Sequence, residues 1–264
     1  MSTKTEAFAS RIVISQPMFL PWRGMFEQIR LCRQFVFYDD VQLPLGGGRG
    51  RGFTTRVQIK TAKGVDWLTL PVIRAAKGKQ LINEAEFAHM NWKQEHLSKI
   101  AQAYKAAPYF ELIYETVVKP IYAIETESLV EFCMQSTSLL CAKLSLKPEK
   151  YVSSRLPVPR DAGASQRVLD ICEHLGATEY ISGLGAMNYI DYGLFEEAGV
   201  RVCYMDYQLP PYPQLHGDFT PYVSIIDMLF NLGSESIAAE LGSECTYWKL
   251  WPNMQDGRPS TATS

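Results

Sequence analysis

The sequence predicts a mixed α/β fold in which both ends of the chain contribute strands to one parallel sheet. Residues 11–41 contain two short apolar runs with an intervening segment whose apolar residues fall at helical spacing, which indicates a β–α–β unit. A second unit of this kind is predicted at residues 180–205. Ligands of open α/β sheets bind at the carboxyl ends of the strands. We therefore expect functional loops directly after the first strand of each unit.

The remaining elements follow from periodicity and turn residues. Residues 53–60 alternate between two faces, and residues 67–73 return as a partner strand. Residues 91–145 have a mostly helical pattern and are predicted to form a helical insert. A further strand at residues 151–154 and a helix ending at His174 complete the prediction.

Length and composition favour one domain with a sizeable core. The chain has 264 residues, of which 47% are hydrophobic and 12% aromatic. We expect a single domain at residues 11–252, with a flexible N-terminus at residues 1–10 and a disordered tail at residues 253–264. A net charge of -2 argues against general attraction to nucleic acids or membranes. Neither a signal segment nor a bilayer-spanning run is present, so a cytoplasmic protein without membrane insertion is expected.

Residues with metal or redox chemistry are scattered along the chain. None of the six cysteines forms a CxxC pair, and the four histidines are not grouped. We therefore predict no metal site, and free thiols in a reducing compartment.

Three polar residues follow the first two predicted strands and are candidates for catalysis. Gln16 follows the first strand, and Asp39 and Asp40 end the second. Successive strand residues point to opposite faces, so only one aspartate can face a given cleft. That carboxylate could act as a general base for an amine or bind a sugar hydroxyl. The alternative is a loop-capping role for the pair.

The turn before the first helix contains Trp22-Arg23-Gly24-Met25, at the place where some nucleotide-binding enzymes have a HxGH signature. Both histidines are absent, which disfavours adenylyl transfer by that route. Arg23 could bind phosphate and Trp22 could stack on a base or sugar. The alternative is that Trp22 and Met25 are core residues.

Two further basic segments are candidate phosphate sites. Residues 46–52 form a glycine-rich loop with two arginines, although no Walker A sequence follows, and a solvated loop is the alternative. Arg56 and Lys60 share the polar face of one predicted strand and could reach a pyrophosphate together. Two ordinary solvated charges are the alternative.

Two loops late in the sequence complete the candidate site. The turn after residues 180–182 contains small residues and leads into a helix, which suits an anion; a packed turn with Asn188 as N-cap is the alternative. A proline-rich loop follows the strand at residues 200–205 and could wall a pocket. The candidate ligand-binding residues from these loops are Ser182, Gly183, Asn188, Tyr189, Tyr212 and Gln214.

Six blocks in this order resemble the WbqC-like family. They are SQPMFLPWRGMFEQI at 15–29, YDDVQ at 38–42, WLTLPV at 67–72, YISG at 180–183, YPQ at 212–214 and SIIDMLFNLG at 224–233. One departure is clear, because an Arg-Asn pair common in the family is Arg56-Val57 here.

The resemblance implies a role in bacterial surface-polysaccharide (O-antigen) biosynthesis, since some members are described as glycine transferases. We expect glycyl-type N-acyl transfer to the amino group of a nucleotide-linked deoxyamino sugar, with a small activated acyl donor and no other cofactor. The alternatives are a nucleotidyltransferase or ATP-dependent amide ligase, and a non-catalytic scaffold that binds nucleotide sugars. A Rossmann-like sheet related to nucleotidyltransferases is expected by analogy. The sequence leaves a homo-oligomer open.

Overall fold

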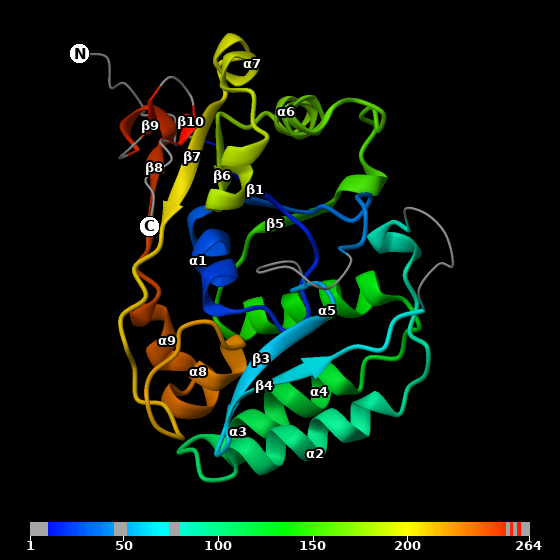
Figure 1. Ribbon diagram of the computed structural model, residues 1–264, viewed down its shortest axis with the longest axis vertical. Helices are drawn as coiled ribbons and strands as arrows, with labels where there is room; N and C mark the ends of the chain where they lie inside the picture. The colour runs from blue at the N-terminus through cyan, green and yellow to red at the C-terminus, as the bar shows by residue number, and fades with distance from the viewer. Residues whose placement is uncertain (1–9, 45–51, 74–79, 252–253, 256–257, 260–264) are drawn as a thin grey trace, which may run out of the picture.

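The computed structural model describes residues 10–44, 52–73, 80–251, 254–255 and 258–259 (Figure 1). The strands are β1 (Arg11–Ser15), β2 (Gln34–Phe37), β3 (Arg56–Thr61), β4 (Gly64–Thr69), β5 (Glu149–Val152), β6 (Glu179–Ser182), β7 (Arg201–Asp206), β8 (Glu244–Tyr247), β9 (Met254–Gln255) and β10 (Arg258–Pro259). The helices are α1 (Arg23–Leu31), α2 (Trp92–Tyr104), α3 (Phe110–Ile113), α4 (Lys119–Tyr122), α5 (Leu129–Lys143), α6 (Ala164–His174), α7 (Tyr192–Glu197), α8 (Ile225–Leu232) and α9 (Ser234–Glu240).

The main sheet has six strands in the order β5-β2-β1-β6-β7-β8. All neighbouring pairs are parallel except β7 and β8, which are antiparallel. In the centre, Val13 of β1 lies opposite Phe35 of β2 and Ile181 of β6. The predicted mixed α/β fold is therefore confirmed, with a sheet assembled from both ends of the chain.

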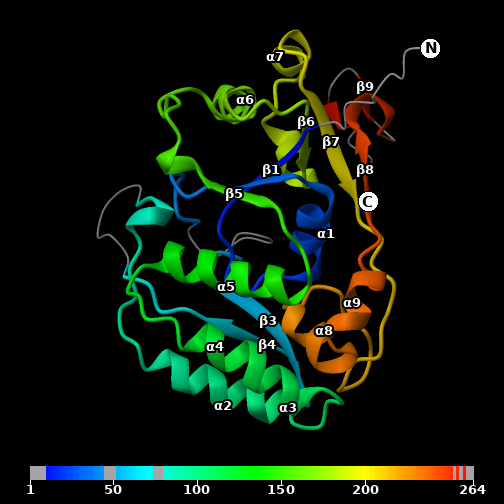
Figure 2. The same cartoon turned by 180° about the vertical axis from the view of Figure 1, so that it is seen from behind.

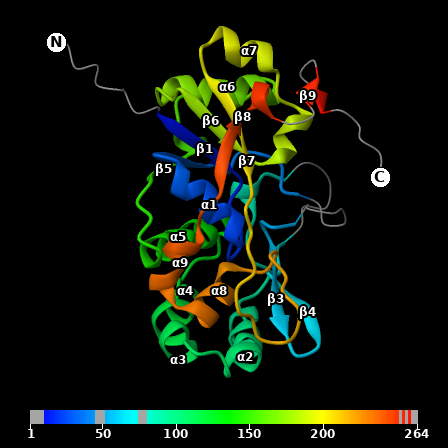
Figure 3. The same cartoon turned by 90° about the vertical axis from the view of Figure 1, so that its left-hand side faces the viewer.

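The sheet buries both faces, because successive strand residues point to opposite sides. One face packs on α1 and contributes Val13, Phe35, Phe37, Ile181, Cys203 and Met205. The other packs on α6 and α7 and contributes Ile12, Ile14, Val36, Tyr180, Val202 and Tyr204. Figure 3 shows the sheet between these two layers. Continuous apolar runs in β1 and β2 are typical of parallel strands covered on both faces.

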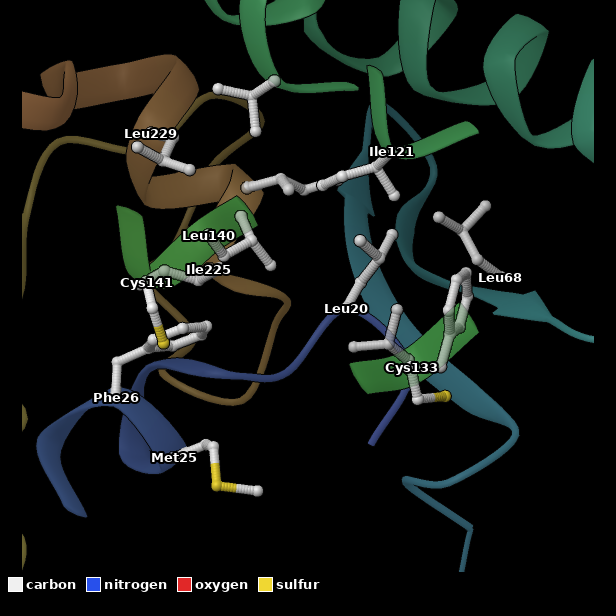
Figure 4. Packing of buried hydrophobic residues seen from close by; sticks show 14 of the residues in the cluster. Leu20, Met25, Phe26, Leu68, Ile121, Cys133, Leu140, Cys141, Ile225 and Leu229 are labelled. Carbon is white, nitrogen blue, oxygen red and sulfur yellow. The ribbon is translucent and has the colours of Figure 1, made fainter. Parts of the chain in front are cut away.

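The helices α2 to α5, α8 and α9 form the lower half of the molecule together with the β3–β4 hairpin (Figures 1 and 2). This half shares one apolar core with the sheet. Figure 4 shows that core, in which Leu20, Leu68 and Cys133 lie together and Phe26 of α1 lies beside Cys141 of α5. Helices α2 to α5 therefore share the core that covers the α1 face of the sheet rather than forming a separate core.

The end of the chain contains one further described feature. Strands β9 and β10 pair antiparallel, with Arg258 opposite Gln255. They lie in the segment predicted to be a disordered tail, and the other residues beyond 251 lie outside the described part of the chain.

The buried His96 should make folding stability sensitive to pH. It lies among the rings of Trp92 and Phe19, and its Nδ1 is 3.2 Å from the Tyr122 hydroxyl. Burial lowers the pKa of His96 from 6.5 to about 4. As pH falls from 6.5 to 4, the unfolded chain gains a proton that the folded protein excludes. Stability is fully present above pH 6.5, and this residue alone should remove about 3 kcal/mol by pH 4.

Urea unfolding between pH 4 and 8 measures this effect. A His96→Phe variant, which keeps an aromatic ring in the core, should lose most of the slope below pH 6.5. The matched change at the exposed His89, His89→Phe, should retain it. Equal slopes in wild type and His96→Phe would contradict the assignment.

Candidate functional site

A cavity of about 470 Å³ opens at the carboxyl ends of β1 and β6. It is lined by Ile14, Ser15, Gln16, Met18, Gln28, Tyr38, Val41, Ala164, Val168, Tyr180, Ser182, Gly183, Gly185, Ala186 and Tyr189. The crossover from β1 to β2 runs through α1 on one face of the sheet, and that from β6 to β7 runs through α7 on the other. The cavity therefore lies where the crossovers diverge, the usual place for ligands in open α/β sheets.

The cavity presents neutral polar groups on an apolar wall. Among its described lining residues, none is Asp, Glu, His, Lys, Arg or Cys. Burial, with a smaller contribution from the Asp40 carboxylate, raises the pKa of Tyr38 to about 12, so its phenol stays protonated at neutral pH. The Tyr180 hydroxyl donates to Ser182 Oγ at 3.2 Å. Hydroxyls and carboxamides such as Gln16 both donate and accept hydrogen bonds, which suits a ligand rich in hydroxyl groups.

Two features of the cavity were missed in the sequence. Gln28 of α1 lines it and donates from Nε2 to the Tyr207 hydroxyl at 2.5 Å. Its signal was its place in the block at residues 15–29, which also contains the lining residue Gln16. The second feature is the amino end of α6, where Ala164 lines the cavity and the N-cap Gly163 supplies no side-chain cap. Backbone N–H groups at a helix start favour an anion.

Four of the predicted site residues line the cavity, namely Gln16, Ser182, Gly183 and Tyr189. Asn188 does not, since it is exposed and its Nδ2 donates to the Gly185 carbonyl at 3.2 Å. The N-cap of α7 is Asp191, whose side chain accepts from Leu194 N. The alternative prediction, that Asn188 is the N-cap of this helix, is therefore wrong.

The aspartate pair anchors the chain beside the cavity rather than facing it. Asp39 is buried, and its carboxylate accepts hydrogen bonds from Ser153 Oγ, Ser154 N and Ser154 Oγ at 2.7 to 3.0 Å. Asp40 accepts from Arg167 Nη2 at 2.8 Å and from the Ser153 hydroxyl. Neither carboxylate lines the cavity. The contacts instead join the end of β2 to the segment after β5 and to α6.

In the turn after β1, Arg23 is buried and Trp22 is partly exposed, so their predicted roles have different outcomes. The Arg23 guanidinium is buried, pairs with Glu27 at 3.2 Å and donates to the carbonyls of Pro210 and Glu240. These contacts occupy it with protein acceptors, away from a phosphate. Trp22 is partly exposed and packs on Tyr207 and Tyr222. Trp22 is therefore not the core residue that the alternative predicted, whereas Met25 is one, with an exposed fraction of 2%.

Arg56 and Lys60 do not form a shared phosphate site on a solvated face. Lys60 is 3% exposed, and its ammonium donates to Gln214 Oε1 at 3.2 Å and to the carbonyls of Gly217 and Asp218. Arg56 lies over the Trp67 ring at 4.4 Å. Residues 46–51 of the predicted phosphate loop lie outside the described residues.

Tyr212 and Gln214 belong to a buried network around Asp227 rather than to the cavity wall. The Asp227 carboxylate accepts from the hydroxyls of Tyr212 and Tyr104 at 2.8 and 2.9 Å, and from Gln214 Nε2 at 3.0 Å. Burial raises the pKa of Asp227, and these hydrogen bonds oppose the shift. A carboxylate with these donors is a structural anchor.

The described residues also bear on metal binding and membrane insertion. Within the described residues, no group of three His, Cys, Asp or Glu side chains is placed to hold a metal ion. The six cysteines are free, and four of them are buried. No helix in the described part of the chain is long and apolar enough to cross a membrane.

Comparison with known proteins identifies relatives by sequence. The profile of the WbqC-like protein family matches residues 16–239. An uncharacterized protein of Mycobacterium tuberculosis is 33% identical over 232 residues, which cover 86% of this chain and 95% of the relative. No solved structure matches the chain significantly. The predicted likeness to nucleotidyltransferases therefore stays an analogy.

Removal of the Lys60 ammonium should destabilise the fold. A Lys60→Met change leaves buried acceptors on Gln214, Gly217 and Asp218 without their donor, at a cost of about 3 kcal/mol. Urea unfolding measures the loss. The control Lys63→Met alters an exposed lysine of the same hairpin and should stay within about 0.5 kcal/mol of wild type. Equal midpoints for the two variants would show that the Lys60 ammonium is not a structural donor.

Proposed function

The chain belongs to the WbqC-like protein family, and on that premise we propose that it transfers a small acyl unit of glycyl type to the amino group of a nucleotide-linked deoxyamino sugar. The observation that carries the proposal is the neutral cavity at the carboxyl ends of β1 and β6. Its volume is within the usual range of small-molecule sites. Tyrosine rings supply flat apolar walls, and Gln16 and Gln28 supply amide groups for sugar hydroxyls.

The phosphates of the ligand would bind at the amino end of α6. This helix has eleven residues, and its first residue, Ala164, lines the cavity. The contacts of Arg167 with Asp40 and with the Val158 and Pro159 carbonyls hold the helix start and the segment before it in place. Backbone N–H groups would then meet a phosphate without a lysine or arginine among the described lining residues.

The reaction exchanges one bond at the acyl carbon for another and moves one proton. The amine of the sugar attacks the acyl carbonyl, the new C–N bond forms, and the bond to the activating group breaks with its electron pair. The amine proton leaves to water or to the departing group. Because the described lining contains no carboxylate or imidazole, we assign the protein's contribution to orientation of the two reactants. Asp39 and Asp40 serve in this proposal as anchors and not as the base.

A non-catalytic binding module is a second candidate. The same lack of a proton-accepting side chain in the described cavity lining favours it. A nucleotide-sugar-binding scaffold would need the same phenols and amides but no acyl donor. Turnover by the purified protein, with the acylated sugar detected by mass spectrometry, separates the two functions.

The two glutamines provide the test. Gln16→Ala and Gln28→Ala should each weaken the binding of a nucleotide-linked amino sugar roughly tenfold in calorimetry, since each removes a ligand hydrogen bond. Gln94→Ala alters an exposed glutamine of α2 and should bind as wild type does. Melting temperatures confirm that the variants are folded. Wild-type affinity in both cavity variants would move the site elsewhere.

A further inference from the structure

We propose that the rings of Trp22, Tyr207 and Tyr222 form a stacking platform outside the cavity that binds the base of the nucleotide. The inference rests on the proposed function, because it divides a nucleotide-linked sugar between two neighbouring subsites. The sugar occupies the cavity, and the base lies on the platform. Of the three rings, only that of Trp22 was a predicted site residue.

The platform adjoins the cavity through Tyr207. Its hydroxyl accepts from Gln28 Nε2 at 2.5 Å, and Gln28 lines the cavity. The hydroxyl also lies 3.7 Å from the position that a Cβ on Gly183, another lining residue, would occupy. The ring of Tyr207 then packs against the Trp22 indole, with 5.3 Å between centroids. A ligand that leaves the cavity past Gln28 therefore reaches aromatic surface directly.

The platform extends from Trp22 to the solvent-exposed ring of Tyr222. The centroid of Tyr222 is 5.9 Å from that of Trp22, and the two planes are inclined by 44°. Tyr222 is 57% exposed, so one face of the platform is open to solvent. The backbone holds these parts in register, because Trp22 forms a bridge with Ser224, two residues after Tyr222. The Ser224 hydroxyl also donates to the Leu20 carbonyl at 2.8 Å.

Gly24 makes room for the platform. The Trp22 indole is folded back over the first turn of α1, so that a Cβ on residue 24 would lie 2.3 Å from its Cη2 and Cζ2 atoms. Such a contact is impossible without movement of the indole. Glycine at this position therefore leaves the space that the indole occupies, and the indole packs there on Tyr207 and Tyr222 before any ligand binds.

The chemistry of the platform fits a nucleobase. All three residues are uncharged, and every base offers a flat π-face to tryptophan and tyrosine rings. Stacking of this kind is tolerant of base identity, so nucleoside diphosphates with different bases should bind with similar affinity. A sugar ring could also lie on such a surface through its C–H face, and the experiment is designed to separate the two.

Calorimetry with three probes tests the platform. The probes are a nucleoside diphosphate, an amino-sugar 1-phosphate and the complete nucleotide-linked amino sugar. Tyr222→Ala should weaken the binding of the nucleoside diphosphate and of the complete nucleotide-linked sugar roughly tenfold. It should leave the binding of the amino-sugar 1-phosphate unchanged. Tyr222→Phe retains the ring and should match wild type. Gly24→Ala should displace the indole and give the same pattern as Tyr222→Ala, with its melting temperature recorded. Gln16→Ala should instead weaken the binding of the amino-sugar 1-phosphate and of the complete nucleotide-linked sugar.

Each of the other outcomes would overturn one defined part of the proposal. Wild-type affinity for the nucleoside diphosphate in both Tyr222→Ala and Gly24→Ala would remove the platform and leave the proposed function standing. Loss of amino-sugar 1-phosphate binding in Tyr222→Ala would mean that the rings hold the sugar and not the base. If wild-type protein binds none of the three probes, the proposed function fails and the platform assignment fails with it.

Discussion

The parallel pairing of β1 with β6 is the contact on which the site depends. It joins Arg11 to Glu179 and Val13 to Ile181, across a sequence separation of 168 residues. Apolar side chains above and below both strands hold the pairing in place, since Ile12 and Ile181 are fully buried. Closing so long a loop costs only slightly more entropy than closing a shorter one, because the cost grows with the logarithm of length. The pairing brings the two carboxyl ends side by side, and the cavity lies between them.

Around this pairing the buried charged groups support the frame, and the neutral groups face the cavity. Arg23, Asp40 and Lys60 each hold a distant segment through carbonyls, hydroxyls or an opposite charge. A buried charge without such partners would be strongly unfavourable, so these residues have little freedom to serve a ligand as well. The cavity wall, in contrast, has phenols and amides that can exchange water for a ligand at low cost. This division explains why charged residues within recognisable sequence blocks lie away from the cavity.

Local sequence pattern predicts the strands and the edge of the sheet where the cavity lies. It does not reveal which side chains are covered by segments that are distant in the sequence. Apolar runs locate β1 and β6, and the rule for parallel sheets then places Gln16 and Ser182 at one edge. Alternation also places Lys60 opposite the apolar face of its strand, but it does not reveal that residues 214–218 cover that side. The same limit applies to Asp39, whose partners lie 114 and 115 residues away. Tyr222 has no local signal, because its role arises only where its backbone segment meets Trp22.

The turn from Pro21 to Gly24 combines contacts that hold the frame with the proposed stacking platform. The Pro21 carbonyl accepts from Ile225 N at 2.9 Å, which fixes the turn to the start of α8. Arg23 points inward to the carbonyls of Pro210 and Glu240. With its neighbours on both sides held, Trp22 has little backbone freedom, and Gly24 provides the space into which its indole folds. A ring held in this way loses little further entropy when a ligand stacks on it, so more of the contact energy remains available for affinity. Under the proposal of a stacking platform, the polar anchors of the frame therefore support binding without touching the ligand.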